Sequence, residues 1–220
     1  RLKNRIRAVK AITRLYAGTY QKITFRHLSE KNLEEVKSIF GEASVTAETS
    51  VDYDNYILDV QEQIHLEGPQ YHNRRKKIAR FNRAHNWTYE PITKENMDSC
   101  LEVNEKWFAD HADEKGAETE QISLKVALQE LDELKLQGGL FRINGKPVAI
   151  YIGTPFNKEV YLSLFMKADN SYPDISLVFT HEFFKRNCQD YRYDNEGCDD
   201  GLVGLRKFKT NMHPALKVPV

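Results

Sequence analysis

Residues 138–153 read GGLFRINGKPVAIYIG, and this stretch decides the fold class. Two runs rich in β-branched and aromatic residues flank the dipeptide Asn144-Gly145, the strongest short-range signal of a tight β-hairpin turn. A third run of this kind, VYLSLFMKA at 160–168, follows after a looser turn at 155–159. The three runs predict a meander of antiparallel strands in the middle of the chain.

Apolar residues with helical spacing surround the meander on both sides. Thr93 is a suitable cap for a helix, and Gly138-Gly139 ends a second helical pattern. In chain order, the predicted elements are a strand at 87–92, a helix after Thr93, a helix at 122–136, the three strands of the meander, a helix at 176–188, a strand at 191–195, a helix at 201–209 and a strand at 214–220. This order matches the GNAT-like acyltransferase fold, an α/β (α+β) fold with a central mixed, mostly antiparallel sheet flanked by helices.

Composition limits the class of protein. A chain of 220 residues that is 40% hydrophobic can build one sizeable core, and its 32 basic and 32 acidic residues cancel. The three cysteines show no C-x-x-C spacing, which is typical of reduced thiols, so we expect no disulfide framework, no structural metal and no cofactor. No apolar run approaches the roughly 20 residues of a membrane span. We expect a cytoplasmic protein, either free or at the inner face of the membrane.

The N-terminal region has a character of its own. The first twenty residues contain six Lys or Arg and no acid, and the helical spacing of their apolar residues is typical of peripheral contact with an anionic membrane. A helix packed on the domain, or a linker, would have the same pattern. Residues 23–40 also align weakly with residues 87–104. We therefore predict a basic N-terminal helix and a truncated or remodelled first GNAT-like unit over 1–70, a basic connecting helix over 71–86 and a complete GNAT-like domain over 87–220.

A dense basic cluster occupies the connecting segment, where residues 72–85 carry six Lys or Arg and no acid. If this segment is helical, Tyr71, Ile78 and Phe81 form a narrow apolar stripe and the cations cover the remainder. A solvated helix face explains the pattern, and so does a track for the phosphates of transfer RNA or of an anionic headgroup. The candidate substrate-binding residues are Tyr71, Arg74, Arg75, Lys76, Lys77 and, further along the chain, Asn195.

Five blocks of the sequence carry a resemblance to a known family. They are YHNRRKKIARF (71–81), GGLFRINGKPVAIYIGTPFN (138–157), FMKADNSYPD (165–174), HEFFKRN (181–187) and NEGCDDGLVGLRKFKTNMHP (195–214). In this order they resemble the phosphatidylglycerol lysyltransferase C-terminal family, which covers the catalytic domains of aminoacyl-phosphatidylglycerol synthases, over about residues 56–214. The resemblance implies a GNAT-like enzyme that transfers an aminoacyl group from aminoacyl-tRNA to a lipid such as phosphatidylglycerol or to a small-molecule acceptor.

The last of these blocks holds most of the candidate catalytic residues. In a helix over this block, Arg206 and Lys209 share a face and could hold a phosphate or the oxyanion of an acyl-transfer intermediate. Glu196 or Asp199, which precede the helix, would accept a proton from the attacking hydroxyl or amine. Glu182, on the preceding helix, is a further candidate. Ordinary ion pairs at the start of a helix are the alternative explanation of the same residues.

Two alternatives to aminoacyl transfer remain open at this point. An acyl-CoA-dependent N-acyltransferase would need a glycine-rich turn after the third strand of the meander, and residues 168–177 contain no glycine. The second alternative is a non-catalytic module of the same fold that binds nucleic acid or membrane.

Overall fold

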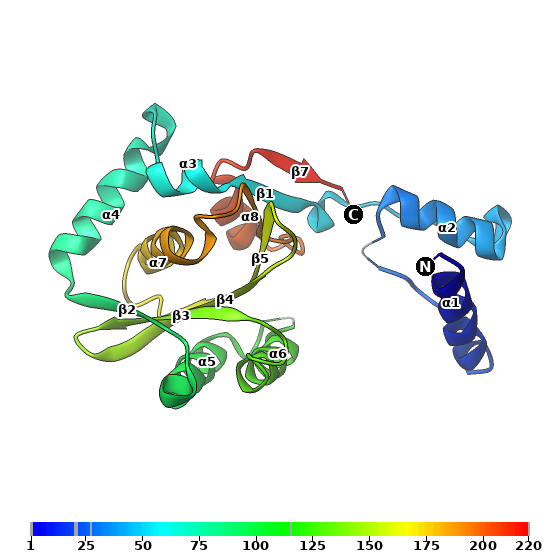
Figure 1. The fold of residues 1–220 in the computed structure, drawn as a ribbon, viewed down its shortest axis with the longest axis horizontal. Coiled ribbons are helices and arrows are strands. Elements are labelled where there is room, and N and C mark those ends of the chain that lie inside the picture. Colours follow the sequence, from blue (N-terminus) through cyan, green and yellow to red (C-terminus); the bar gives the residue numbers. More distant parts are fainter. Residues whose placement is uncertain (1, 20–21, 27, 115, 220) are drawn as a thin grey trace.

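The computed structural model describes residues 2–19, 22–26, 28–114 and 116–219. At the centre of this described part lies a seven-stranded sheet with the strand order β2-β3-β4-β5-β6-β1-β7 (Figure 1). The strands are β1 (Asn55–Asp59), β2 (Trp87–Pro91), β3 (Gln137–Ile143), β4 (Lys146–Pro155), β5 (Val160–Ala168), β6 (Tyr193–Asn195) and β7 (Leu216–Val218). Neighbouring strands pair antiparallel except β5 and β6, which pair parallel. The expected mixed, mostly antiparallel sheet is therefore confirmed.

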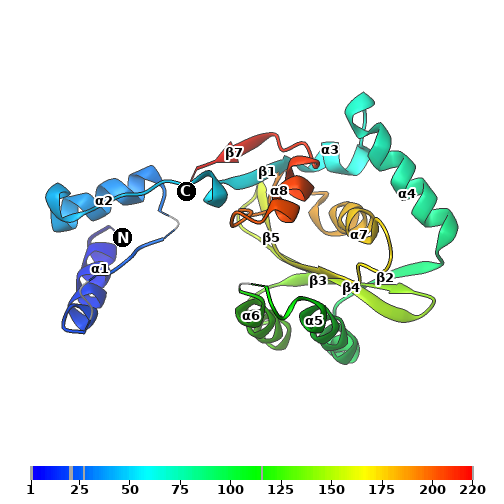
Figure 2. The ribbon, with the colours of Figure 1, turned by 180° about the vertical axis from the view of Figure 1, so that it is seen from behind.

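The described residues also form α-helices, some of which cover the two faces of the sheet. They are α1 (Leu2–Ala17), α2 (Glu30–Phe40), α3 (Val60–His65), α4 (His72–Ala84), α5 (Met97–His111), α6 (Ala117–Gln129), α7 (Ile175–Phe183) and α8 (Val203–Thr210). Helices α5 and α6 lie on one face, and α7 lies on the other face between the sheet and α4 (Figures 1 and 2). Because successive strand residues point to opposite faces, Ile150 and Ile152 join the core beneath α5 and α6, whereas Tyr151 stacks on Phe183 of α7. The GNAT-like fold class is thus confirmed.

The meander forms as the sequence predicts. Asn144 and Gly145 have φ values of 50° and 80°, the left-handed conformation that both central residues of a tight hairpin turn require. The second helix is shifted from its predicted range of 122–136, since α6 spans Ala117–Gln129 and the chain then turns over 130–135. The apolar spacing misleads here because Leu131 and Leu136 still pack on the core, although both lie beyond the end of the helix.

Strand β1 is not among the strands that the sequence predicts. It pairs with β6 and with β7, and its side chains at Tyr56 and Leu58 are fully buried. The sheet therefore extends beyond the predicted 87–220 domain into the 1–70 segment. Residues 22–26, which align with β2, form no strand, whereas α2 begins after a Ser29 cap. Helices α1 and α2 lie apart from the sheet in both ribbon views (Figures 1 and 2). The division into a shortened first unit and a complete domain stays a prediction.

Candidate functional site

The sheet opens between β5 and β6. Only residues 160–162 of β5 pair with residues 193–195 of β6, although β5 continues to Ala168. A bulge lies at the same point, because Ile152 pairs with Phe165 and Gly153 pairs with Ser163, which leaves Leu164 without a partner on β4. β6 ends at Asn195, so from Ser163 onward β5 has no strand partner on that side among the described residues, and this unpaired side of β5 is the opening. The loop that follows β6 and carries Glu196 and Asp199 borders this opening.

Four side chains at the opening form one hydrogen-bonded chain. The Tyr151 hydroxyl donates to Oε1 of Glu196 at 2.7 Å and lies 3.0 Å from Oγ of Ser163. Oγ of Ser163 is in turn 2.9 Å from Oδ1 of Asp194. Tyr151 is 1% exposed and Asp194 is fully buried. Strands β4, β5 and β6 thus link a buried carboxyl group, through two hydroxyl groups, to a second carboxyl group in the loop.

The hydrogen bonds among Tyr151, Ser163, Asp194 and Glu196 set how many protons the two carboxyl groups hold together. Each hydroxyl has one proton to donate. If Asp194 and Glu196 were both ionised, they would take both hydroxyl protons, and the Tyr151–Ser163 contact would have no donor. If Asp194 is protonated and donates to Ser163, every contact in the chain has one donor. One proton shared between the two carboxyl groups therefore satisfies the whole chain.

The surroundings place that proton on Asp194. Burial raises the pKa of Asp194 well above its ordinary value, and the nearby charge of Glu196 adds to the shift. Burial also raises the pKa of Glu196, but Lys209, the Tyr151 hydrogen bond and Arg74 all oppose this increase. We infer that Glu196 is the ionised end of these four groups, because the upward shift of its pKa is opposed by more neighbours than that of Asp194, and Glu196 lies in the loop bordering the opening.

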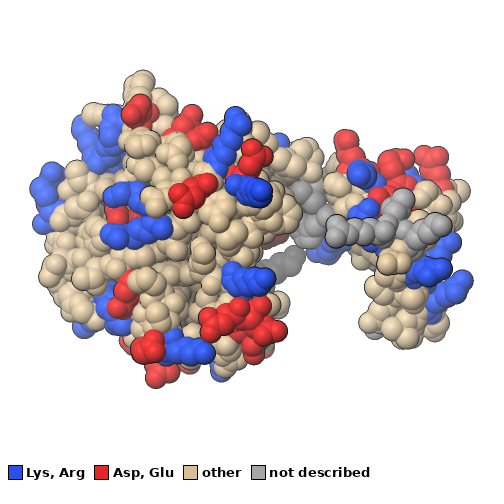
Figure 3. All heavy atoms as spheres, in the orientation of Figure 1, with Lys and Arg blue, Asp and Glu red and all other residues tan. Residues whose placement is uncertain are grey.

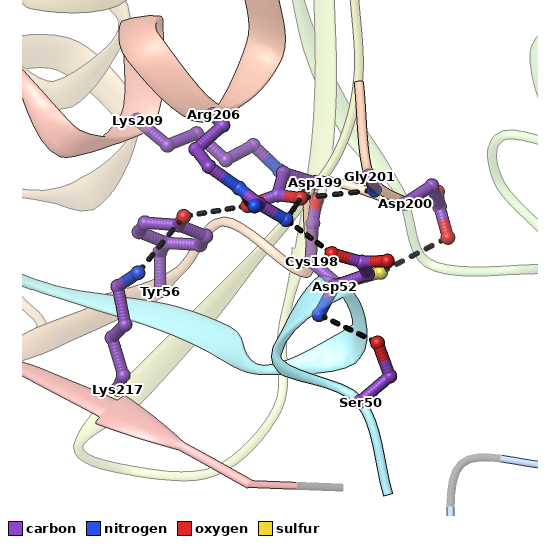
Figure 4. Close-up of polar contacts among 10 residues, drawn as sticks. All are labelled: Ser50, Asp52, Tyr56, Cys198, Asp199, Asp200, Gly201, Arg206, Lys209 and Lys217. Carbon is purple, nitrogen blue, oxygen red and sulfur yellow. Dashed lines mark hydrogen bonds and ion pairs between the residues drawn. The ribbon is translucent and has the colours of Figure 1, made fainter. Parts of the chain in front are cut away.

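Arg206 is held by two carboxylates rather than left free (Figure 4). Its Nε and Nη2 donate to the two oxygens of Asp199 at 2.9 and 2.7 Å, and Nη2 also donates to Asp52 at 2.5 Å. Asp199 is fully buried and accepts two further bonds, from the Tyr56 hydroxyl at 2.6 Å and from the Gly201 backbone N–H at 3.0 Å. These contacts, Arg206 foremost, hold the pKa of Asp199 well below its usual range. Arg206 thus joins α8 to the loop after β6 and to the segment before β1.

Lys209 is also bonded within the protein. It is 7% exposed, and its Nζ donates to the backbone carbonyls of Glu196 at 2.5 Å and Cys198 at 2.6 Å. Arg206 and Lys209 therefore approach the same loop, as their spacing predicts, and both are bonded to protein groups. Their contact with a substrate anion stays a prediction.

The other candidates in this region have local partners. Glu182 is 5% exposed and forms ion pairs with Lys185 at 3.1 Å and Arg186 at 3.3 Å, within its own helical segment. Asn195 accepts a hydrogen bond from the Gly197 backbone N–H at 2.8 Å, which shapes the start of the loop. Neither the Glu182 nor the Asn195 side chain is hydrogen-bonded to the group that runs from Asp194 through Ser163 and Tyr151 to Glu196. Roles for both in catalysis or binding stay predictions.

The predicted basic helix is α4, and its cations point in different directions. Figure 3 shows Lys and Arg spheres over α4 at the left edge of the molecule, mixed with Asp and Glu elsewhere on that face. Arg75 donates to backbone carbonyls at the end of α3, and Lys77 pairs with Asp174 at 3.0 Å. Lys76 is exposed. The four cations at 74–77 therefore do not form one continuous track.

The buried side of α4 contains the predicted stripe and also Arg74, although the cations were expected to cover the rest of the helix. Tyr71, Ile78 and Phe81 pack inward, and the Tyr71 hydroxyl donates to Glu62 at 3.0 Å. Burial, together with Glu62, raises the pKa of Tyr71 to about 12. Arg74 lies on the same side and is only 7% exposed.

The thiols and the acids add no further site. Burial raises the pKa of Cys188 well above its ordinary value and that of Cys100 to about 12, which disfavours a thiolate nucleophile at either position. Nowhere in the described part of the chain do three or more His, Cys, Asp or Glu side chains gather as metal ligands would. None of the described helices combines the length and apolar character needed to cross a bilayer.

Sequence reasoning missed three members of the hydrogen-bonded chain, Tyr151, Ser163 and Asp194. The available signal was a polar group within a strongly apolar strand, as in Ile150-Tyr151-Ile152 and in the run VYLSLF. Such a residue needs a buried hydrogen-bond partner. Asp52 and Tyr56, which hold Arg206 and Asp199, precede the candidate loop by more than 130 residues and belong to no motif.

Solved structures with the same fold include three close matches. A conserved protein of unknown function from Bacteroides thetaiotaomicron is 28% identical with a TM-score of 0.78, covering 86% of this chain and 65% of that one. The C-terminal domain of a putative lysylphosphatidylglycerol synthetase from Agrobacterium fabrum is 16% identical with a TM-score of 0.69, and the match covers 97% of this chain and 70% of that one. L-PGS from Bacillus licheniformis is 16% identical with a TM-score of 0.55, and the match covers 76% of this chain and 58% of that one. The chain thus spans less than two thirds of the length of the Bacteroides protein.

The sequence itself matches a family. No curated protein matches the chain. The family described as "Phosphatidylglycerol lysyltransferase, C-terminal" matches residues 3–197, which include Arg74, Tyr151, Asp194 and Glu196 and end before Asp199. This match covers most of the chain, and the folds of the solved structures agree with it. The chain therefore belongs to the phosphatidylglycerol lysyltransferase C-terminal family.

Proposed function

We propose that this domain is an aminoacyltransferase, which moves an amino acid from aminoacyl-tRNA to a hydroxyl or amine of a lipid such as phosphatidylglycerol or of a small molecule. Membership of the family and the GNAT-like fold make the domain a transferase of the acyltransferase type. The observation that carries the finer proposal is the Glu196 chain. The carboxyl group of Glu196, which we infer to be ionised, borders the opening between β5 and β6, and the buried Tyr151 hydroxyl holds it in place.

In the proposed reaction, Glu196 is the general base. It takes the proton of the acceptor hydroxyl or amine while the acceptor atom attacks the ester carbonyl of the aminoacyl group. The carbon–oxygen bond to the terminal ribose of the transfer RNA then breaks, and the ribose oxygen leaves with the proton that Glu196 has taken up. The hydrogen bond from Tyr151 keeps Glu196 in one orientation throughout. Asp194, protonated and buried, completes the set of donors directed toward Glu196.

The start of α7 favours an aminoacyl-tRNA donor over acyl-CoA. In CoA-dependent relatives of this fold, a glycine-rich turn at this place binds the diphosphate. Here the turn lacks glycine, and Asp174 precedes α7 and pairs with Lys77 at 3.0 Å and Arg80 at 2.5 Å. Asp169 is also in this turn, where it pairs with Lys106. The turn thus lacks the glycine backbone that would surround a diphosphate, and the cations beside it already pair with Asp174 and Asp169.

A donor competition tests the proposal. The purified chain is given radiolabelled lysyl-tRNA or alanyl-tRNA, with phosphatidylglycerol vesicles or soluble amines and alcohols as acceptors, and acetyl-CoA is offered in parallel. We expect label to move from at least one aminoacyl-tRNA to an acceptor, and no turnover or binding with acetyl-CoA. Turnover with acetyl-CoA alone would overturn the proposed donor. Binding of transfer RNA or vesicles without any transfer would favour a non-catalytic module.

A further inference from the structure

Arg74 is a buried cation with part of its hydrogen-bonding capacity unused. It is 7% exposed and lies on the inner side of α4. Its Nη1 donates to Oε1 of Gln63 at 2.6 Å, whereas Nε and Nη2 are buried and have no hydrogen-bond partner among the described residues. Buried donors of a charged group are nearly always paired in folded proteins, so two unpaired donors on one guanidinium need an explanation.

The neighbours of Arg74 hold the guanidinium in a fixed orientation. Gln63 is 1% exposed, and its own Nε2 donates to the carbonyl of Met212 at 2.8 Å. The backbone carbonyl of Gln63 lies 3.0 Å from Nδ1 of His181. On the other side, the ring of Tyr71 lies 5.6 Å from the guanidinium carbon. The two unused donors are therefore held in place before any ligand arrives.

A second arginine of this chain shows what these donors can bind. Arg206 uses the same pair of atoms, Nε and Nη2, to bind both oxygens of Asp199. This edge of a guanidinium is planar and matches the two oxygens of a carboxylate or phosphate. In Arg206 a residue of the protein occupies this edge, whereas no described residue occupies it in Arg74.

The charges around Arg74 connect it to the Glu196 chain. Burial lowers the pKa of Arg74 to about 10, so the group stays charged at neutral pH. The negative charge of Glu196 acts to raise the pKa of Arg74, and the positive charge of Arg74 acts to lower the pKa of Glu196. Hydrogen bonds also link the two regions, because Gln63, the partner of Arg74, donates to the Met212 carbonyl, the Met212 N–H donates to the Lys209 carbonyl at 3.1 Å, and Nζ of Lys209 donates to the Glu196 carbonyl. The unpaired edge of Arg74 therefore belongs to the same region as the carboxylate that we propose as the base.

We propose that the Nε–Nη2 edge of Arg74 binds the phosphate of the acceptor, a glycerol phosphodiester headgroup whose free hydroxyl then lies next to Glu196. A single buried guanidinium fits one phosphate group better than it fits an extended RNA backbone, which requires a row of exposed cations. This inference deepens the proposed function and rests on it.

The test measures binding and needs no catalysis. The full chain, labelled with ¹⁵N-arginine, is titrated with glycerophosphoglycerol, the soluble headgroup of phosphatidylglycerol, and in separate samples with inorganic phosphate and a CCA trinucleotide. We expect the Nε–H resonance of Arg74 to shift and saturate with glycerophosphoglycerol, at lower concentration than with inorganic phosphate. Arg74→Lys keeps the charge but loses the two-pronged bond, and we expect it to weaken this affinity by about tenfold or more.

Arg83→Lys, an exposed change on the same helix, is the matched control and should leave the affinity unchanged. Arg74→Gln serves as a second variant if the lysine variant unfolds, and circular dichroism checks both. Equal affinity in Arg74→Lys and wild type would overturn the inference, as would a response to the trinucleotide alone or an equal response to all phosphates. If the headgroup binds at Arg74 but wild type transfers nothing, the proposed function fails and this site remains.

Discussion

Replacing Asp194 with asparagine tests whether Asp194 is protonated in its hydrogen-bonded group with Ser163, Tyr151 and Glu196. Asparagine has the shape of a protonated aspartate, and its amide can donate to Ser163 as we infer that the carboxyl group does. The change should therefore preserve the hydrogen bonds to Tyr151 and Glu196 while it removes one titrating group.

The expected effect on stability depends on pH, and its sign follows from proton binding. In the unfolded chain, an aspartate loses its proton above a pKa of about 3.9. In the folded chain, burial raises the pKa of Asp194 well above this value, so the folded state keeps the proton over a pH range in which the unfolded state has lost it. Asp194 therefore lowers the free energy of unfolding by about 1.4 kcal/mol for each pH unit in that range.

Urea unfolding followed by circular dichroism at a series of pH values from 4 to 8 measures this effect. The free energies of unfolding of wild type and Asp194→Asn should be similar near pH 4. The variant should gain on wild type by about 1.4 kcal/mol per pH unit as the pH rises, until Asp194 itself ionises. Parallel curves for the two proteins, or a wild type that gains stability on the variant as the pH rises, would refute the shared proton.

Two further variants separate catalysis from architecture. Tyr151→Phe should raise the pKa of Glu196, because the hydrogen bond that it removes stabilises the ionised form. The acidic limb of the pH–rate profile should therefore move to higher pH. A limb at the same pH as in wild type would contradict the Tyr151–Glu196 contact. Arg206→Lys should lower the melting temperature and the transfer rate together, because the Arg206 side chain joins α8 to two other segments. Differential scanning calorimetry measures the melting temperature. A loss of rate at an unchanged melting temperature would instead make Arg206 a substrate-binding residue.

The sheet was largely predictable, because its middle strands are specified by short-range signals such as Asn144-Gly145. Strand β1 was not predictable, since its five residues are followed at once by α3, and both of its partners lie about 140 or more residues along the chain. A strand of this kind is defined by its neighbours more than by its own sequence.

The candidate site was predictable only in part. The spacing of Arg206 and Lys209 correctly brings both toward one loop, but Asp52, which shares Arg206, is distant in sequence. Arg74 belongs to a run of cations, and the available signal was its spacing, because it lies three residues after Tyr71 and four before Ile78 and so shares a helix face with the apolar stripe. Its burial depends on Gln63, a residue of α3 that carries no motif.

The central claim is that Glu196 is the general base of aminoacyl transfer, and single-turnover rates test it most directly. They are measured with aminoacyl-tRNA and the preferred acceptor for wild type, Glu196→Gln, Glu182→Gln and the exposed control Glu159→Gln. We predict that Glu196→Gln slows the transfer step by about 10²-fold to 10⁴-fold without lowering the melting temperature, whereas Glu159→Gln leaves the rate unchanged. A full rate in Glu196→Gln, or a comparable loss in Glu182→Gln alone, would contradict the account.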